Sequence, residues 1–260
     1  VQYGIFIRDV LHGNFGKSYI YGKPAMDLIF ERMPATLELV AVAACLVLCI
    51  AIPLGVYAGA YPKRASSKLI MSGSILGISL PSFWVGMMMI YIFAVVLRLL
   101  PASGRGNTVM VGNVALSIFA PGGIRYVILP AITLALTNVA TMLRLTRSGI
   151  LENMRQDYIK FARAKGVPAK SILFGHALKN ALIPVVTIFG MDLGNMIAFT
   201  TITETIFAWP GMGKLLIDAI NKSDRPIIVA YLMAAACMFV VLNFIVDILY
   251  TLIDPRIELR

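Results

Sequence analysis

The chain has 260 residues, of which 59% are hydrophobic and only 14% are charged, and its mean hydropathy is +0.83. Soluble domains carry about 25% charged and about 45–50% apolar residues, so this composition excludes an ordinary soluble domain. The formal net charge is +10. We interpret this charge as a sign of membrane topology, with nucleic-acid binding as the weaker alternative.

The apolar residues are gathered in blocks, and about 20 consecutive apolar residues suffice for a helix to cross a bilayer. Unbroken apolar runs favour helices over barrel strands, in which apolar and polar residues would alternate. We therefore predict an all-α membrane protein with five spans in this chain. The spans cover roughly residues 37–61, 69–97, 126–143, 181–201 and 227–253.

Lys and Arg are distributed unevenly between the connecting segments. The segments 61–68, 144–180 and 253–260 hold thirteen of these cations in 53 residues, whereas the other connecting segments hold ten in 89. The positive-inside rule places the denser set, and with it the C-terminus, in the cytoplasm. The predicted domains are an extracytoplasmic segment (1–36), a transmembrane domain (37–253) with a cytoplasmic loop (144–180), and a cytoplasmic tail (254–260).

The start of the chain suggests that a further span precedes it. The chain opens at Val1 with no initiator Met and no signal-peptide pattern, so we expect another span before it; a genuine five-span protein is the alternative. The stretch Pro24–Arg32 is predicted as a short amphipathic surface helix. The three cysteines, Cys45, Cys49 and Cys237, lie in apolar runs and are predicted as small buried hydrophobes rather than metal ligands.

No catalytic constellation is found. The stretch from Gly13 to Ser18 ends like a phosphate-binding loop, but its first glycine is replaced by Leu11 and no strand precedes it. There is no HExxH or GxSxG motif, and the two histidines, His12 and His176, are predicted on opposite sides of the membrane. We therefore expect a protein that performs no covalent chemistry itself.

Polar and helix-breaking residues interrupt the predicted spans. A carboxylate in the hydrocarbon costs about 2.5–3.5 kcal/mol on insertion scales, so it should face a bundle interior or a water-filled path. The functional interpretation is a polar-lined translocation pathway, and the alternative is an interhelical hydrogen-bond network. The candidate pathway residues are Ser79, Pro81, Asn138, Asp192 and Asn195.

The segment between the third and fourth predicted spans carries its own helical pattern. We predict a helix over Asp157–Lys165, a break at Gly166, and a second amphipathic helix that begins at Pro168 and leads to Pro184. Such a helix could lie on anionic lipid or dock into a groove of a cytoplasmic partner.

This segment resembles the EAA loop of ABC-importer permeases, in the form found in the dipeptide, oligopeptide, opine and nickel subfamily. The matching stretches are residues 162–166, 176–181 and 183–185, followed by 204–213, Asn243, Asp247 and 254–256. The resemblance covers essentially the whole chain but begins one helix late. It implies a MetI-like permease fold with six transmembrane helices in the intact subunit, the first being absent from this chain.

The resemblance also implies roles for particular residues. Where the general loop motif has Glu-Ala-Ala, this chain has Lys160, Phe161 and Ala162. Any contact with the ATPase that relies on the Glu is therefore not carried over. The implied ATPase-docking residues are Ala162, Ala164, Lys165, Gly166, Val167, Pro168, Ile172, Leu173 and His176, and the implied periplasmic motif comprises Glu204, Trp209, Pro210, Gly211 and Gly213.

The implied function is that of a permease subunit in the bacterial inner membrane, moving peptides or related solutes by alternating access. Its implied partners are a second homologous permease, two ATPase subunits that carry ATP and Mg, an extracytoplasmic substrate-binding protein and membrane lipid. No cofactor is expected on this chain. The alternatives are a secondary transporter without an ATPase and a membrane-embedded enzyme, and the substrate stays open among dipeptides, oligopeptides, glutathione, opines and nickel chelates.

Overall fold

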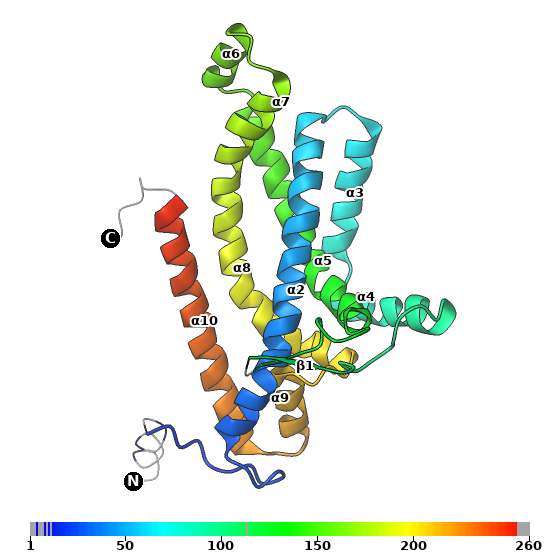
Figure 1. The fold of residues 1–260 in the computed structure, drawn as a ribbon, viewed down its shortest axis with the longest axis vertical. Helices are drawn as coiled ribbons and strands as arrows, with labels where there is room; N and C mark the ends of the chain where they lie inside the picture. The colour runs from blue at the N-terminus through cyan, green and yellow to red at the C-terminus, as the bar shows by residue number, and fades with distance from the viewer. Residues whose placement is uncertain (1–3, 5–7, 9, 11, 113, 254–260) are drawn as a thin grey trace. The chain divides into compact units, whose positions relative to one another are not determined.

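The computed structural model describes residues 4, 8, 10, 12–112 and 114–253. Most of them are helical (Figure 1). In chain order the elements are α2 (Ala25–Ala60), α3 (Ala65–Ser79), α4 (Ser82–Met89), the π-helix η1 (Ile90–Val96), β1 (Val109–Val111), β2 (Val114–Leu116), α5 (Ile124–Asn153), α6 (Asp157–Ala164), α7 (Ala169–Ser171), the π-helix η2 (Ile172–Ala177), α8 (Leu178–Ile206), α9 (Met212–Asn221) and α10 (Arg225–Ile253).

The predicted spans correspond to these long helices. Within the described residues, four helices are long and apolar enough to cross a membrane, or five if α3 and the α4–η1 pair together form one span. This agrees with a polytopic helical membrane protein, because a helix satisfies its own backbone hydrogen bonds in lipid. The predicted all-α fold class is confirmed; the small antiparallel hairpin β1–β2 pairs Val109 with Leu116.

The second predicted span is not one continuous helix. The helix α3 ends at Ser79, Leu80 is extended (φ −86°, ψ 130°), and α4 begins at Ser82. The cause is Pro81, because a proline disfavours helical backbone in the residue that precedes it. The span predicted over 69–97 is therefore broken at Pro81, one of the helix-breaking residues expected within the spans.

The first span differs from its prediction at the N-terminal side. The stretch Pro24–Arg32 is not a separate surface helix, because α2 begins at Ala25 and continues through Pro34 to Ala60. The apolar side chains of Ala25, Leu28 and Ile29 are buried, which joins this stretch to the core rather than to the surface.

The chain divides into two compact units, and the long helices contribute to both. Unit 1 comprises residues 1–42, 83–133 and 195–241. Its core packs the first turns of α2 against α9 and the first half of α10. The buried members are Ala25, Leu28, Ile29, Met212, Leu215, Ala219, Ile227, Ala230, Tyr231 and Ala234.

Unit 2 comprises residues 43–82, 134–194 and 242–260. Here α2 approaches α5 closely, because a Cβ at Gly55 would lie 2.6 Å from Thr146 Cβ and one at Gly59 would lie 2.7 Å from Ile150 Cβ. Small residues four apart allow such close helix packing in membranes. Gly190 of α8 faces Val246 of α10 in the same way.

The cysteines depart from their prediction. Cys45, Cys49 and Cys237 are free thiols, but all three are exposed on the surface of this chain rather than buried in it. The reason is that apolar helices of a membrane protein also turn apolar faces outward, towards lipid or a neighbouring subunit, so apolar surroundings in sequence do not imply burial.

Candidate functional site

The segment Asp157–Ala177 forms two short helical stretches joined by a tight turn, and we call it the helix–turn–helix segment. In Figure 1 its helices α6 and α7 lie beyond the ends of α5 and α8. Gly166 has a φ of +79°, its N–H donates to Arg163 O (2.9 Å), and Val167 N–H donates to Ala162 O (3.1 Å). This pair of bonds is a Schellman motif, which requires the left-handed residue that glycine supplies. The predicted break at Gly166 is confirmed.

The two halves of the segment share one apolar core. Ile159 of α6 and Ile172 and Ala177 of η2 are buried together with Ile150 of α5 and Val56 of α2. Val167, Leu173 and Leu178 pack against the same cluster. The predicted second amphipathic stretch is therefore present, and it is fixed to the helices that continue from it.

Hydrogen bonds from Tyr158 add a polar connection to the same helices. The Tyr158 hydroxyl donates to Asn153 Oδ1 (2.8 Å) on α5 and accepts from Asn180 Nδ2 (3.0 Å) on α8. At the start of α6, Lys160 donates to Asp157 Oδ1 (2.8 Å), and this bond lowers the pKa of the Asp157 carboxyl. The segment is thus attached to both flanking long helices.

Two aromatic side chains of the segment point outward. Phe161 is 63% exposed and Phe174 is 52% exposed, and the Lys165 ammonium lies 4.6 Å from the centre of the Phe161 ring. Neither Phe161 nor Phe174 was among the predicted docking residues, although an aromatic residue within a basic, amphipathic stretch was a usable signal. Of the predicted docking residues, Ile172 is buried, Ala162, Val167 and Leu173 are half-buried, and Ala164, Lys165, Gly166, Pro168 and His176 are exposed.

A second arrangement, in unit 1, surrounds the buried carboxylate of Glu204. Glu204 Oε1 accepts from Thr36 Oγ1 (2.6 Å) and Oε2 accepts from Lys214 N–H (2.9 Å). Thr36 Oγ1 in turn accepts from Met212 N–H (2.9 Å), and the Trp209 indole donates to Ala35 O (2.9 Å). We call this network, which joins α8, α9 and α2, the Glu204 corner.

The glycines of the corner are required by close packing. A Cβ on Gly211 would overlap the Glu204 carboxylate, and one on Gly213 would lie 2.6 Å from Thr201 Oγ1. Trp209 is fully buried and Pro210 is half-buried. The five residues predicted as one motif are thus brought together, and their shared effect is to hold the turn between α8 and α9 in one shape.

A neighbouring ion pair in unit 1 was not predicted. Glu38 is buried and accepts from Arg105 Nε (2.9 Å), Ser117 N–H (2.7 Å) and Ile118 N–H (2.7 Å). It fastens the loop that contains β1 and β2 onto α2. The Arg105 guanidinium also lies 5.7 Å from the centre of the Trp209 ring, which connects this pair with the Glu204 corner.

The predicted pathway residues show mostly local bonding. Ser79 Oγ donates to Ile75 O (2.9 Å) and Asn138 Nδ2 lies 3.4 Å from Leu134 O, each within its own helix. Pro81 is exposed, Asp192 is half-buried and Asn195 is exposed. Among the described residues, no group of three or more His, Cys, Asp and Glu side chains could hold a metal ion. A pathway through these residues stays a prediction.

Comparisons with known proteins decide the family. Residues 51–259 match the family model described as the binding-protein-dependent transport system inner membrane component. The chain belongs to this family. It is therefore the membrane-spanning permease subunit of an ATP-binding-cassette importer, as the resemblance of its loop implied, and ATP hydrolysis falls to partner subunits rather than to the permease.

Curated relatives align with nearly the whole of this chain. It is 40% identical over 259 residues to the oligopeptide transport system permease protein AppB of Bacillus subtilis, covering 99% of this chain and 80% of that protein. It is 35% identical over 272 residues to the dipeptide transport system permease protein DppB of Escherichia coli K12, again covering 99% and 80%.

Solved structures agree on the fold. The permease superposes on a chain of the inward-facing MetNI methionine ABC transporter with a TM-score of 0.67 and 16% identity, covering 88% of this chain and 97% of that one. It also matches a chain of an amino acid ABC transporter crystallised with histidines, with a TM-score of 0.56 and 14% identity, covering 89% and 94%. The predicted MetI-like permease fold is confirmed.

Proposed function

We propose that the permease carries peptides and that its helix–turn–helix segment is the docking element for the ATPase subunits. The observation that carries the second part is the division of the segment into a buried apolar side and an exposed aromatic one. Ile159 and Ile172 are buried in the core of unit 2, whereas Phe161 and Phe174 are exposed. An exposed phenylalanine beside basic residues is suited to fill a cleft on a protein partner.

The attachment of the segment explains how docking would become transport. A ligand shifts a conformational equilibrium only if it binds the two states differently. ATP-driven closure of the ATPases would move the docked segments, and the shared apolar core together with Tyr158 would pass this movement to α5 and α8. A loosely tethered loop would transmit nothing. ATP and Mg would be held by the ATPase subunits, and this chain would bind no cofactor.

The orientation follows from the Lys and Arg distribution. The segment 144–180 would face the cytoplasm of a bacterial cell, with the C-terminus on the same side. The Glu204 corner would then face outward, where an extracytoplasmic binding protein delivers substrate. A second, homologous permease subunit would complete the pathway, and Ser79, Pro81, Asn138, Asp192 and Asn195 are its candidate lining in this subunit.

The substrate class rests on the relatives, whose names specify oligopeptide and dipeptide transport. A thermal-shift screen of the cognate binding protein against short peptides, glutathione, opines and nickel chelates tests it. We expect stabilisation by peptides. Stabilisation by a metal chelate alone would contradict the peptide assignment without affecting the docking role of the segment.

The docking role is tested by Gly166→Asp in the reconstituted transporter. We expect the variant to insert normally, because Gly166 lies outside the apolar spans, but to separate ATP hydrolysis from uptake. Gly104→Asp is the matched control, since Gly104 also has a positive φ (+87°) and open space around it, but lies in unit 1. Normal, ATP-dependent uptake by Gly166→Asp would refute the role of the turn.

A further inference from the structure

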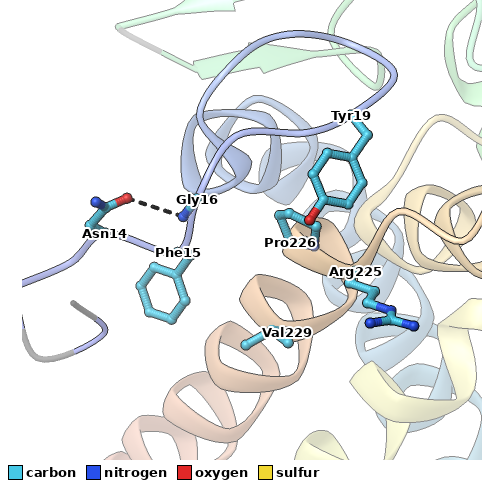
Figure 2. A pocket seen from close by; sticks show the side chains of 7 residues that line it. All are labelled: Asn14, Phe15, Gly16, Tyr19, Arg225, Pro226 and Val229. Carbon is cyan, nitrogen blue, oxygen red and sulfur yellow. Dashed lines mark hydrogen bonds between the residues drawn. The ribbon is translucent and has the colours of Figure 1, made fainter. Parts of the chain in front are cut away.

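A cavity of about 300 Å³ opens beside the first turns of α10, within unit 1. Figure 2 shows Arg225, Pro226 and Val229 following one another along α10, with the remaining residues supplied by the N-terminal segment. No acidic side chain lines the cavity among the described residues. The lining residues are Asn14, Phe15, Gly16, Tyr19, Arg225, Pro226 and Val229.

The wall of this cavity is fixed by a buried carboxylate. Asp224 is fully buried, and its carboxylate accepts from Ser18 Oγ (2.5 Å), Tyr19 N–H (3.3 Å) and Ile20 N–H (3.4 Å). Gly16 packs on Pro226, since a Cβ there would lie 3.6 Å from Pro226 Cβ. The N-terminal segment is therefore held on α10, and the carboxylate of Asp224 is occupied by these donors.

The charge left around the cavity is positive. Arg225 is exposed, and its guanidinium makes no ion pair or hydrogen bond with any described residue. Lys17 is exposed nearby in sequence, and the Lys222 ammonium lies 6.0 Å from the centre of the Tyr21 ring. A further cation of the N-terminal segment, Lys23, is paired with Glu31 at 3.6 Å.

An exposed apolar face continues from the cavity along α10. The part Arg225–Val246 is apolar enough to span the membrane, yet only 22% of its most apolar window is buried inside the chain. After Val229 the same helix face carries Met233 and Val240, which are 42% and 65% exposed. Arg225 is the first residue of this candidate span, so we infer that the cavity lies at the boundary between hydrocarbon and headgroups.

Aromatic residues mark the same boundary. Tyr19, which lines the cavity, is 74% exposed, and Ile20 and Tyr21 are each 42% exposed. Tyr side chains gather at the headgroup level of membranes, because one end of the ring is apolar and the other is polar. This loop therefore has the composition of an interfacial anchor.

We propose that the cavity binds the headgroup of an anionic phospholipid. Arg225 pairs with the phosphate, Tyr19 and Asn14 offer hydrogen-bonding groups, and one acyl chain lies along the face formed by Val229, Met233 and Val240. A free anion would use the cation but not the apolar face. Cations at a membrane surface favour anionic lipids over zwitterionic ones.

The test counts phospholipids retained by the purified transporter complex. The complex is incubated with vesicles of phosphatidylglycerol or phosphatidylcholine, and bound lipid is measured by native mass spectrometry. We expect selective retention of phosphatidylglycerol, and a loss of about five-fold in Arg225→Gln, the change expected from removing one cation at an anionic surface. Arg125→Gln is the matched control, because Arg125 lies at the start of α5 and bonds Leu99 O.

Two further arms separate lipid from other occupants. Val229→Asn should weaken retention of both lipids, because it places a polar group on the apolar face. It also provides a second test of the proposal if Arg225→Gln does not fold. Retention unchanged in both variants would overturn the proposal, as would displacement of the lipid by millimolar inorganic phosphate. A photoreactive residue at position 229 that joins a protein instead of lipid would contradict it as well.

Discussion

The Glu204 corner and the helix–turn–helix segment use opposite means to hold a turn between helices. The corner encloses a carboxylate whose two oxygens accept from Thr36 and Lys214, and its glycines leave no room for a side chain. The segment relies on aliphatic contacts around Ile159 and Ile172 and leaves its aromatic residues outside. The corner is thus built to keep one shape, and the segment is built to offer a surface.

The largest expected effect is a loss of stability when the carboxylate of the Glu204 corner is removed. Glu204→Ala would leave the buried hydroxyl of Thr36 and the N–H of Lys214 without their acceptor, and each unsatisfied buried group costs about 1–3 kcal/mol. We expect a loss of about 3 kcal/mol in the free energy of unfolding, measured by denaturant titration in detergent. Glu31→Ala, which removes an exposed carboxylate of α2, should change it by less than about 0.5 kcal/mol. Equal losses in the two variants would contradict the network.

A smaller effect is expected from Gly211→Ala. Its Cβ would overlap the Glu204 carboxylate, and overpacking of this kind costs about 1–3 kcal/mol. Gly73→Ala provides the control, because Gly73 lies in α3 with nothing within 4 Å of an added Cβ. That variant should be neutral or stabilised by up to about 1 kcal/mol through helix propensity. Thermal unfolding of the two variants side by side measures the difference. A Gly211→Ala variant as stable as the unmodified chain would show that the Glu204 corner rearranges to accommodate the added methyl group.

The smallest effect belongs to the helix–turn–helix segment. Tyr158→Phe removes the hydroxyl that joins Asn153 and Asn180. Because the site is exposed and water replaces the lost partner, we expect a cost below about 1 kcal/mol. The informative measurement is uptake per ATP hydrolysed, which should fall if the hydroxyl helps to pass movement to α5 and α8. An unchanged ratio would assign the connection to the apolar core alone.

The features that could be predicted from the sequence are those that depend on residues close together in the chain. The helices follow from unbroken apolar runs, and the turn follows from Gly166 and Pro168, which act within a few residues. Sequence reasoning named Pro81 as a helix-breaking residue but still drew one span over 69–97, because the apolar pattern continues across the proline. It also missed the pairing of Glu38 with Arg105 and of Ser18 with Asp224, since 67 and 206 residues separate the partners and only the folded chain brings them together.

The most direct measurement of the central claim is protection of position 174 by the ATPase subunits. Phe174→Cys and, as control, Phe119→Cys, both at exposed phenylalanines, are prepared with Cys45, Cys49 and Cys237 replaced by alanine. A charged maleimide is then applied with and without the ATPase subunits. The account predicts that labelling at position 174 is blocked by the ATPases while labelling at 119 is unchanged; equal labelling of position 174 in both states would contradict it.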